Sequence, residues 1–429
     1  MDEAVYGVWL QLVFGEGSRK VPPLLDYFGS CRTIYESDDV ERRLSGLLTS
    51  ADISKMEDTP LDAATEIMEA CRRLHYSVLT PDCEAYPTRL RNIPDYPAAL
   101  YISGVLPNID DEVCIGMVGT RRASRYGYRV ANDIAMGLSS CGAIVVSGCA
   151  RGIDTASHQG ALMAGGKTLA VLGCGINTRY NLENEGLRKV ISTSGALISE
   201  YPPGAPPLSY HFPIRNRIIS ALSLGVVVVE AGAKSGSLIT ANLALEQGKD
   251  IFAVPGEINH AQAKGVNRLI FDGANPIESA YDVLEGYVVQ YPHRLRLENL
   301  GNRHAIIPDK GVRPKWERES KVQQKTTPKK SEPPAKPEKK NTNSNGGSAG
   351  KSPKTSPQAP APVSAESQYP IGMSDGAVKV LGALDAMPKQ LDELIDVLGM
   401  SASEIARYIT ELELYGLVKS LPGKRYSKT

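Results

Sequence analysis

Four consecutive valines at positions 226–229 constrain the fold of this chain more than any other feature. A strand that is apolar on both faces must be covered on both faces, as the central strands of a parallel sheet are. A small polar turn, Ser235-Gly236-Ser237, follows and can open a helix. Open α/β sheets bind ligands at the carboxyl ends of their strands. The sequence therefore predicts a ligand site directly after this strand.

Short apolar segments alternate with helical segments between residues 110 and 290. We predict strands over residues 113–118, 143–147, 168–172, 196–199, 226–229 and 251–254. We predict helices between them over residues 127–140, 155–164, 183–192, 216–223 and 238–247. This alternation is typical of an α/β fold with a doubly wound, mostly parallel sheet.

The flanking segments differ from this central region. Residues 1 to about 75 have a helical pattern, and a Pro-rich connector runs over residues 86–104. Residues 309–370 are rich in Pro, Lys, Ser, Gly and Asn, so we expect a disordered tether. From Asp309 to Glu366, thirteen Lys and Arg stand against six Asp and Glu, a net +7; the whole chain is +0, so the rest is −7. The tether therefore either adds salt-sensitive affinity for nucleic acid or is only a solvated linker.

Several classes of protein do not fit the composition. The seven cysteines form no CxxC pair and the six histidines no HExxH motif, so we expect neither disulfides nor a metal site. No apolar run approaches the roughly 20 residues that span a bilayer. The start Met1-Asp2-Glu3 lacks the basic residues of a signal peptide. We expect a cytoplasmic protein without a membrane span.

The end of the first predicted strand favours an anion over a dinucleotide. The sequence 116–121, GMVGTR, is not a GxGxxG fingerprint, and the second strand ends at Ser147-Gly148 rather than at an acidic residue. We therefore expect no NAD and no other cofactor. Gly119 lets the backbone approach a ligand, and Arg121 offers a planar fork for phosphate. The alternative is a packed strand end with a surface arginine.

Two further segments point to an anion. Arg215, Asn216 and Arg217 are predicted near the start of a helix, where cations oppose the helix dipole unless they face a shared anion. Surface ion pairs are the alternative. Ser235-Gly236-Ser237 supplies a hydroxyl cap and backbone N–H groups, which together can bind phosphate. Three sequence features at the carboxyl ends of the predicted strands, each weak by itself, thus predict the same anion site.

Enzymatic alternatives are weaker. Ser147, Asp154 and His158 are the residue types of a hydrolase triad, but no GxSxG motif surrounds the serine. Asp154 and His158 are spaced i,i+4, so we expect them to pair on one helix face. Nucleotide phosphoribohydrolases carry PGGxGTxxE at the equivalent strand–helix junction, whereas residues 231–242 read AGAKSGSLITAN without the glutamate. The missing carboxylate removes the expected acid–base group.

Seven ordered motifs resemble those of the DprA/Smf family of bacterial DNA-processing proteins. The resemblance is dense over residues 86–290 and weaker at both ends. The motifs are VGTRRASRYG (118–127), SGCARGID (147–154), GKTLAVLGCG (166–175), SEYPPG (199–204), HFPIRNRIIS (211–220), VVVEAGAKSGSLITANLALEQGKDIFAVPG (227–256) and GVNRLIFDGA (265–274).

The resemblance implies a non-catalytic, Rossmann-like domain that binds single-stranded DNA, forms homodimers and loads the recombinase RecA onto incoming DNA in natural transformation. Motif by motif, it assigns the DNA-binding residues as Gly119, Thr120, Arg121, Ser147, Gly148, Lys167, Arg215, Asn216, Arg217, Ser235, Gly236 and Ser237. Dimer contacts are expected at Leu269 and Ile270. Tyr210 and Phe212 could stack a base, although core packing is the alternative for Phe212. The chain departs from the family at Tyr180-Asn181, where Tyr-Pro is usual.

Four domains follow from these observations. Residues 1–85 form a helical domain similar to SAM or helix-hairpin-helix domains, and residues 86–292 form the Rossmann-like domain. Residues 293–370 form the basic linker. Residues 371–429 have three short helices and two strands around the turn Pro422-Gly423, the layout of a winged helix.

The predicted recognition helix of the winged-helix domain, residues 401–415, is poorly suited to a major groove. It carries Glu404, Glu411 and Glu413 against one Arg407. We therefore expect a protein partner or a weak effect on DNA binding. Isolated residues 374–429 should not bind duplex DNA at micromolar concentration in a fluorescence-anisotropy titration. Micromolar binding with a steep salt dependence would contradict this.

Overall fold

The structure is a computed structural model that describes residues 2–300, 374–385, 389–414, 417–421 and 425–428. These residues belong to two compact units, one before and one after residue 333, and each unit is described by itself. No helix within the described ranges is long and apolar enough to cross a membrane.

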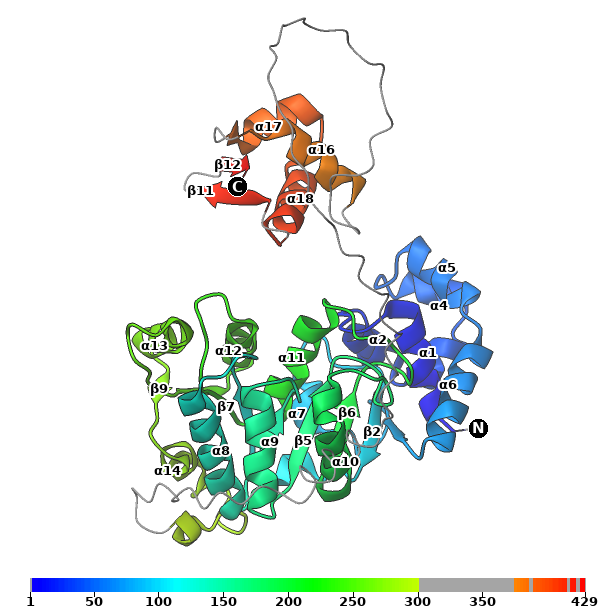
Figure 1. Ribbon diagram of the computed structural model, residues 1–429. Coiled ribbons are helices and arrows are strands. Elements are labelled where there is room, and N and C mark those ends of the chain that lie inside the picture. The colour runs from blue at the N-terminus through cyan, green and yellow to red at the C-terminus, as the bar shows by residue number, and fades with distance from the viewer. Residues whose placement is uncertain (1, 301–373, 386–388, 415–416, 422–424, 429) are drawn as a thin grey trace, which may run out of the picture. The chain divides into compact units, whose positions relative to one another are not determined.

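The first unit is built on a nine-stranded sheet with strand order β1-β2-β6-β5-β4-β3-β7-β8-β9 (Figure 1). The strands are β1 Ser77–Leu79, β2 Leu100–Gly104, β3 Cys114–Val118, β4 Ile144–Ser147, β5 Thr168–Leu172, β6 Ala196–Ser199, β7 Gly225–Val228, β8 Asp250–Ala253 and β9 Asn275–Pro276. Strands β3 to β9 run parallel, whereas β1 and β2 are antiparallel at one edge. The doubly wound, mostly parallel sheet is confirmed.

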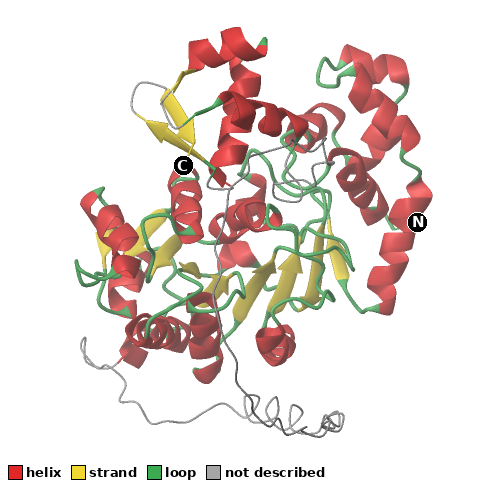
Figure 2. Ribbon diagram, turned by 45° about the horizontal axis from the view of Figure 1, so that its top comes forward, coloured by secondary structure: helices red, strands yellow, loops and turns green. Residues whose placement is uncertain are grey.

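Helices cover both faces of the sheet (Figure 2). The helices after β2 are α8 Arg125–Ser140, α9 Ile153–Met163, α10 Glu185–Ser194, α11 His211–Leu222, α12 Gly236–Glu246, α13 Lys264–Phe271 and α14 Ala280–Leu284. Single 3₁₀ turns lie at Ile109–Asp111, Leu182–Asn184, Ala261–Ala263, Glu285–Tyr287 and Leu297–Leu300.

The valine run explains how the two faces are filled. Val226 and Val228 belong to the apolar core beneath α11 and α12, and Val227 and Val229 belong to the core beneath α8 and α9. All four side chains are buried. Because successive side chains of a strand point to opposite faces, a run without polar residues satisfies both cores.

Two sequence-based expectations need correction. Helix α11 begins at His211, five residues before the predicted start, because Pro213 falls in the first turn, where proline is tolerated. Arg215, Asn216 and Arg217 therefore lie within the helix rather than at its start. The segment read as a Pro-rich connector also contains a strand, β2, which pairs with β1 and β6 and whose residues Leu100–Ile102 are buried.

Seven short helices precede or flank this edge of the sheet, and the N-terminal ones lie beside β2 in Figure 1. They are α1 Ala4–Phe14, α2 Val21–Phe28, α3 Cys31–Glu36, α4 Asp39–Leu44, α5 Ser50–Asp58, α6 Leu61–Arg73 and α7 Thr88–Arg91. Helix α1 is apolar on nearly all sides and almost wholly buried. Such a helix is stable only when other elements surround it, so the N-terminal helices pack around it.

A buried ion pair of the sheet domain lies where the N-terminal helices meet it. Arg217 Nη2 lies 2.7 Å from Glu200 Oε1, and both side chains are less than 5% exposed, at 4% and 3%. The backbone N–H of Gly17, between α1 and α2, donates to the same oxygen at 2.9 Å. Gln11 of α1 donates its side-chain amide to the carbonyl of Glu200. Burial raises the pKa of Glu200, and the Arg217 charge opposes that rise.

Residues 293–300, which we assigned to the linker, pack against the sheet domain. Leu295 is buried in the core beneath α8, and Asn299 donates its side-chain amide to the carbonyl of Ser140 at 2.8 Å. The rest of the predicted linker, residues 301–370, lies outside the described residues.

The second unit has the predicted winged-helix elements. These are α16 Asp375–Ala383, β10 Lys389–Gln390, α17 Leu391–Leu398, α18 Ala402–Leu414, β11 Val418–Leu421 and β12 Arg425–Lys428, with strand order β10-β12-β11. On α18, Glu411 accepts hydrogen bonds from the Ser374 backbone N–H and hydroxyl, both at 2.7 Å. One of the three acidic residues of the predicted recognition helix therefore holds the start of α16. The predicted turn Pro422-Gly423 and the helix end at Tyr415 lie outside the described residues.

The Arg217–Glu200 pair should stabilise the fold where the N-terminal helices meet the sheet. Arg217→Met leaves a buried carboxylate without its cation, so we expect the free energy of unfolding to fall by about 3 kcal/mol in urea denaturation. Arg268→Met is a matched control, since it breaks an exposed pair with Asp272 at 2.9 Å and should cost no more than about 0.5 kcal/mol. Equal losses in the two variants would contradict this role.

Candidate functional site

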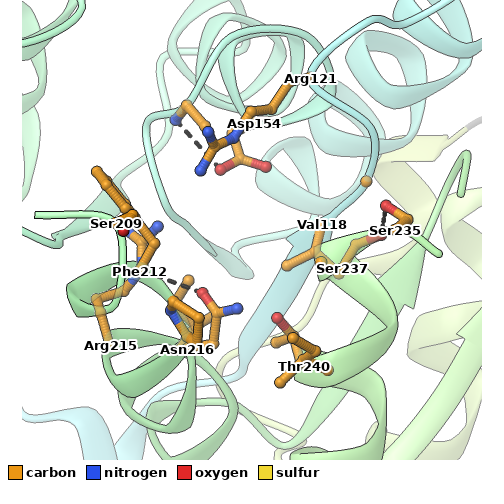
Figure 3. Close-up of a pocket in the computed structure, with 16 residues that line it drawn as sticks. Val118, Arg121, Asp154, Ser209, Phe212, Arg215, Asn216, Ser235, Ser237 and Thr240 are labelled. Carbon is orange, nitrogen blue, oxygen red and sulfur yellow. Dashed lines mark hydrogen bonds between the residues drawn. The ribbon is translucent and has the colours of Figure 1, made fainter. Parts of the chain in front are cut away.

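A cavity of about 260 Å³ lies at the carboxyl ends of β3 and β7. We call it the Arg121 cavity. Figure 3 shows Arg121, Phe212 and Ser237 on different sides of it. Its lining comes from four segments far apart in the sequence: Val118, Gly119 and Arg121; Ala150 and Asp154; Ser209, Phe212, Pro213, Arg215, Asn216 and Ile219; and Ser235, Gly236, Ser237, Ile239 and Thr240.

Gly119 is required where β3 enters the cavity. A Cβ at this position would lie 2.5 Å from Cγ1 of Ile153 and 2.9 Å from the carbonyl oxygen of Glu230. The next residue, Thr120, donates its backbone N–H to that same carbonyl at 2.7 Å. This bond ties the loop after β3 to the end of β7 and so fixes the backbone that carries Arg121.

Arg121 is an exposed cation on an aromatic wall. Its guanidinium lies 5.2 Å from the ring centroid of Phe212, and the Phe212 ring lies 5.2 Å from that of Tyr180. No carboxylate in the described ranges lies within ion-pair distance of Arg121. Phe212 is half-buried, so it is a wall of the cavity rather than a core residue. Arg121 is therefore available to an anion in the cavity.

Arg215 reaches the cavity from α11 as a buried cation. Its Nη1 donates to the carbonyl of Gly148 at 2.9 Å and to that of Val171, and its Nε donates to Oδ1 of Asn216 at 3.3 Å. Nη2 forms no hydrogen bond with a described residue. Burial lowers the pKa of Arg215 and raises the pKa of Asp154, and the two opposite charges offset each other. Asp154 in turn accepts from the backbone N–H of Ala150 at 3.2 Å.

The start of α12 forms the opposite wall. Ser235 is the N-cap residue, but its hydroxyl does not cap the helix; it hydrogen-bonds to the hydroxyl of Ser237 at 2.8 Å. The backbone N–H groups of Gly236 and Ser237 have no hydrogen-bond partner within the described part of the chain. A Cβ at Gly236 would meet no atom within 4 Å, so the approach is open. Such a helix start binds anions through its N–H groups and its dipole.

Other predicted site residues lie outside this cavity. Ser147 is fully buried and donates to the carbonyl of Met117 at 2.6 Å, while Gly148 and Thr120 contribute backbone contacts behind the lining. Lys167 is exposed at the amino end of β5, on the opposite edge of the sheet. Arg217 points to Glu200, as described above. The structure thus brings together Gly119, Arg121, Arg215, Asn216 and residues 235–237, but neither Lys167 nor Arg217.

The predicted pairing of Asp154 with His158 is wrong. Nδ1 of His158 hydrogen-bonds to Oγ1 of Thr168 at 2.7 Å, and the ring is fully buried. His158 therefore has no access to the cavity. Asp154, weighed in the sequence only for a catalytic triad, lines the cavity instead. Asp154 lies two residues after Gly152, in the first turn of α9. This position, directly after a strand and its turn, could have predicted that Asp154 lines the cavity.

The loop that carries Tyr180 explains the departure at residue 181. Asn181 has φ 51°, in the left-handed region that asparagine tolerates and that proline is excluded from. Its side chain accepts from Arg151 Nε at 3.2 Å and donates to the carbonyl of Cys149 at 3.3 Å. This replacement lets the loop turn and places the Tyr180 ring against Phe212.

The two predicted dimer residues differ in what they contact. Leu269 of α13 is half-buried and packs against the core of the sheet domain, and Ile270 is half-buried. The next residue, Phe271, is 81% exposed. Phe271 is therefore the most exposed apolar side chain of α13.

Comparisons with known proteins agree with this architecture. The sequence model of the family described as "DNA recombination-mediator protein A" matches residues 77–288, and that of the "DprA winged helix domain" matches residues 354–424. Protein Smf of Synechocystis is 32% identical over 367 residues, which cover 85% of this chain and 83% of the relative. DNA processing protein DprA of Streptococcus pneumoniae is 43% identical over 209 residues, covering 49% and 72%. The X-ray structure of the S. pneumoniae protein superposes with a TM-score of 0.58 at 31% identity, covering 66% of this chain and 98% of that chain.

A sheet with a cationic cavity at its carboxyl edge, followed in sequence by a winged helix, defines a DNA-processing protein of the recombination-mediator class. The first matched residue, 77, coincides with the first residue of β1. The chain belongs to the DprA/Smf family.

His158 should make the fold sensitive to mild acid. Burial lowers its pKa to about 3, below the 6.5 of an unfolded histidine, so the unfolded chain takes up the proton first as the pH falls. Between pH 7 and pH 5 this loss amounts to about 2 kcal/mol of unfolding free energy. His158→Gln should reduce the measured loss by that amount in urea denaturation at the two pH values. The exposed His293→Gln is the control, and an unchanged loss in His158→Gln would contradict the assignment.

Proposed function

We propose that this chain binds single-stranded DNA in the Arg121 cavity without cleaving it. The observation that carries the proposal is the cavity itself, where Arg121 lacks an ion pair in the described structure and faces the open start of α12. Both groups recognise phosphate oxygens without reading a base. Phe212 and Tyr180 stand beside them, and a cationic groove with aromatic side chains is how proteins bind single strands regardless of sequence.

The lining supports binding rather than catalysis. Asp154 is the one acidic residue among those that line the Arg121 cavity, and no histidine or cysteine is among them. Its carboxylate is held by the Ala150 N–H and lies beside Arg215. Hydrolysis of a nucleotide needs an acid–base group together with a second catalytic group or an activated water. The phosphoribohydrolase alternative therefore receives no support from the lining.

We extend the proposal to the wider process. The protein would act as a homodimer in the cytoplasm and load RecA onto incoming single strands in natural transformation. The description of the family as a DNA recombination mediator supports a role beside a recombinase. The seven cysteines are all free thiols, which favours a reducing compartment.

Arg121→Ala tests the proposed site. Loss of one phosphate contact should weaken binding to a dT 12-mer by about tenfold and lower the slope of log affinity against log salt by about 0.7. Fluorescence anisotropy of the full-length chain at several salt concentrations measures both quantities.

Lys167→Ala is the matched control, since it removes the same charge from the opposite edge of the sheet and should change affinity by less than about twofold. Unchanged affinity in Arg121→Ala with an intact fold would refute the site. Nucleotide turnover that Arg121→Ala or Asp154→Asn abolishes would refute the non-catalytic function.

A further inference from the structure

A second cavity lies on the other side of the end of β7. Its volume is about 650 Å³, and it is enclosed by the start of α8, the loop after β8 and helix α13. We call it the Glu230 cavity after the residue that follows the valine strand. Its lining is mostly apolar, with Val229, Ala263 and Val266 as buried walls.

One buried carboxylate stands in this apolar lining, while Glu257 is exposed at the rim. Glu230 is 3% exposed, and its Oε2 accepts the backbone N–H of Ser124 at 2.8 Å. Its Oε1 accepts no hydrogen bond from a described residue; the nearest basic atom is Nδ1 of His260, at 3.8 Å. One oxygen is thus committed to holding the start of α8, and the other is available to a ligand. Because this free oxygen is a hydrogen-bond acceptor with negative charge, a ligand with N–H groups would be favoured over an anion.

The mouth of the cavity carries an aromatic ring. Tyr126 is half-exposed, and its hydroxyl donates to the carbonyl of Pro255 at 3.3 Å, which fixes the ring at the entrance. Apolar walls, an aromatic edge and one acceptor suit a flat heterocycle with N–H donors.

The loop between β3 and α8 connects the two cavities. Arg121 lines the first and Arg125 lines the second. Arg122 between them and Arg129 one turn later are also exposed, and none of the four has a carboxylate within ion-pair distance among the described residues. A strand whose backbone lies at Arg121 would find further cations leading to the Glu230 cavity. Neutralisation of phosphates along such a path adds affinity at each step.

We propose that the Glu230 cavity takes one guanine base of a DNA strand bound at Arg121. The inference rests on the proposed function and adds base preference to it. The Watson–Crick edge of guanine places N1–H and the 2-amino group side by side, and both can donate to Glu230 Oε1. Thymine places its single N–H between two carbonyl oxygens, which the carboxylate repels. Adenine and cytosine each place an amino group beside a ring acceptor.

The test compares the affinities of the full-length protein for two DNA oligonucleotides. A dT 12-mer with one central guanine should bind about five- to tenfold tighter than the plain dT 12-mer in fluorescence anisotropy. Hypoxanthine in place of guanine removes the 2-amino donor and should lose part of this ratio. 7-Deazaguanine changes only the opposite edge of the base and should keep it.

Glu230→Gln should reduce the ratio to about one, because the amide oxygen keeps the acceptor for Ser124 while an NH2 donor replaces the acceptor that faces the base. Glu257→Gln removes an exposed charge at the rim of the same cavity and should leave the ratio unchanged. Equal affinities for the two strands in the wild type, or an unchanged ratio in Glu230→Gln, would overturn the proposal.

Titration with free dGMP shows whether the Glu230 cavity binds a base within a DNA strand or a free nucleotide. Binding of dGMP that depends on Glu230, without a preference between the two strands, would overturn the proposal in favour of a nucleotide ligand. If Arg121→Ala weakens dT binding but the two strands bind equally, only the guanine site fails. If Arg121→Ala leaves dT binding unchanged, the proposed function fails as well.

Discussion

The parallel pairing of β3 with β7 is the constraint on which both cavities depend. The register Gly116–Val226 and Val118–Val228 brings the two strand ends to the same level. The bond from the Thr120 N–H to the Glu230 carbonyl extends the contact beyond the strands. The loop after β3 therefore crosses the end of β7, so one end of this loop lies at the Arg121 cavity and the other at the Glu230 cavity.

Helix α11 separates the roles of two arginines that are close in sequence. An α-helix turns by about 100° per residue, so residues 215 and 217 project about 200° apart. Arg215 projects toward Gly148 and Asp154, and Arg217 projects toward Glu200. Each buried cation has a buried carboxylate near it, which lowers the cost of removing both from water. A single motif thus supplies one residue to the cavity and another to the buried ion pair where the N-terminal helices meet the sheet.

Much of the fold was accessible from the sequence because apolar periodicity records burial directly. Strands 168–172 and 196–199 agree residue for residue with β5 and β6, and the other predicted core strands agree within one residue. Strands β1, β2 and β9, at the two edges of the sheet, were missed because they are short and lie near or contain prolines that mark turns. At the site, Gly119, Arg121 and residues 235–237 could be placed because they follow strands that the pattern identified.

The places of the remaining site residues could not be predicted, because they depend on strand direction, helix boundaries and contacts between distant segments. Lys167 belongs to the motif GKTLAVLGCG, which also contains β5. Because Lys167 precedes β5, it lies at the amino end of the strand, on the opposite side of the sheet from the Arg121 cavity. The direction in which Arg217 projects depended on where α11 begins. Glu230 follows the most conspicuous strand, yet the cavity beside it is closed by α13, some thirty residues later. Such contacts follow from the order of strands in the sheet rather than from local sequence.

The central claim is that the Arg121 cavity accepts the backbone of a single strand. Fluorescence anisotropy of the full-length chain with a single-stranded and a duplex oligonucleotide of equal length, each at two salt concentrations, tests it most directly. A recessed site reached between α11 and α12 should favour the flexible single strand by about tenfold or more, with affinity falling as salt rises. Equal binding of the duplex, or single-strand binding that does not respond to salt, would contradict the account.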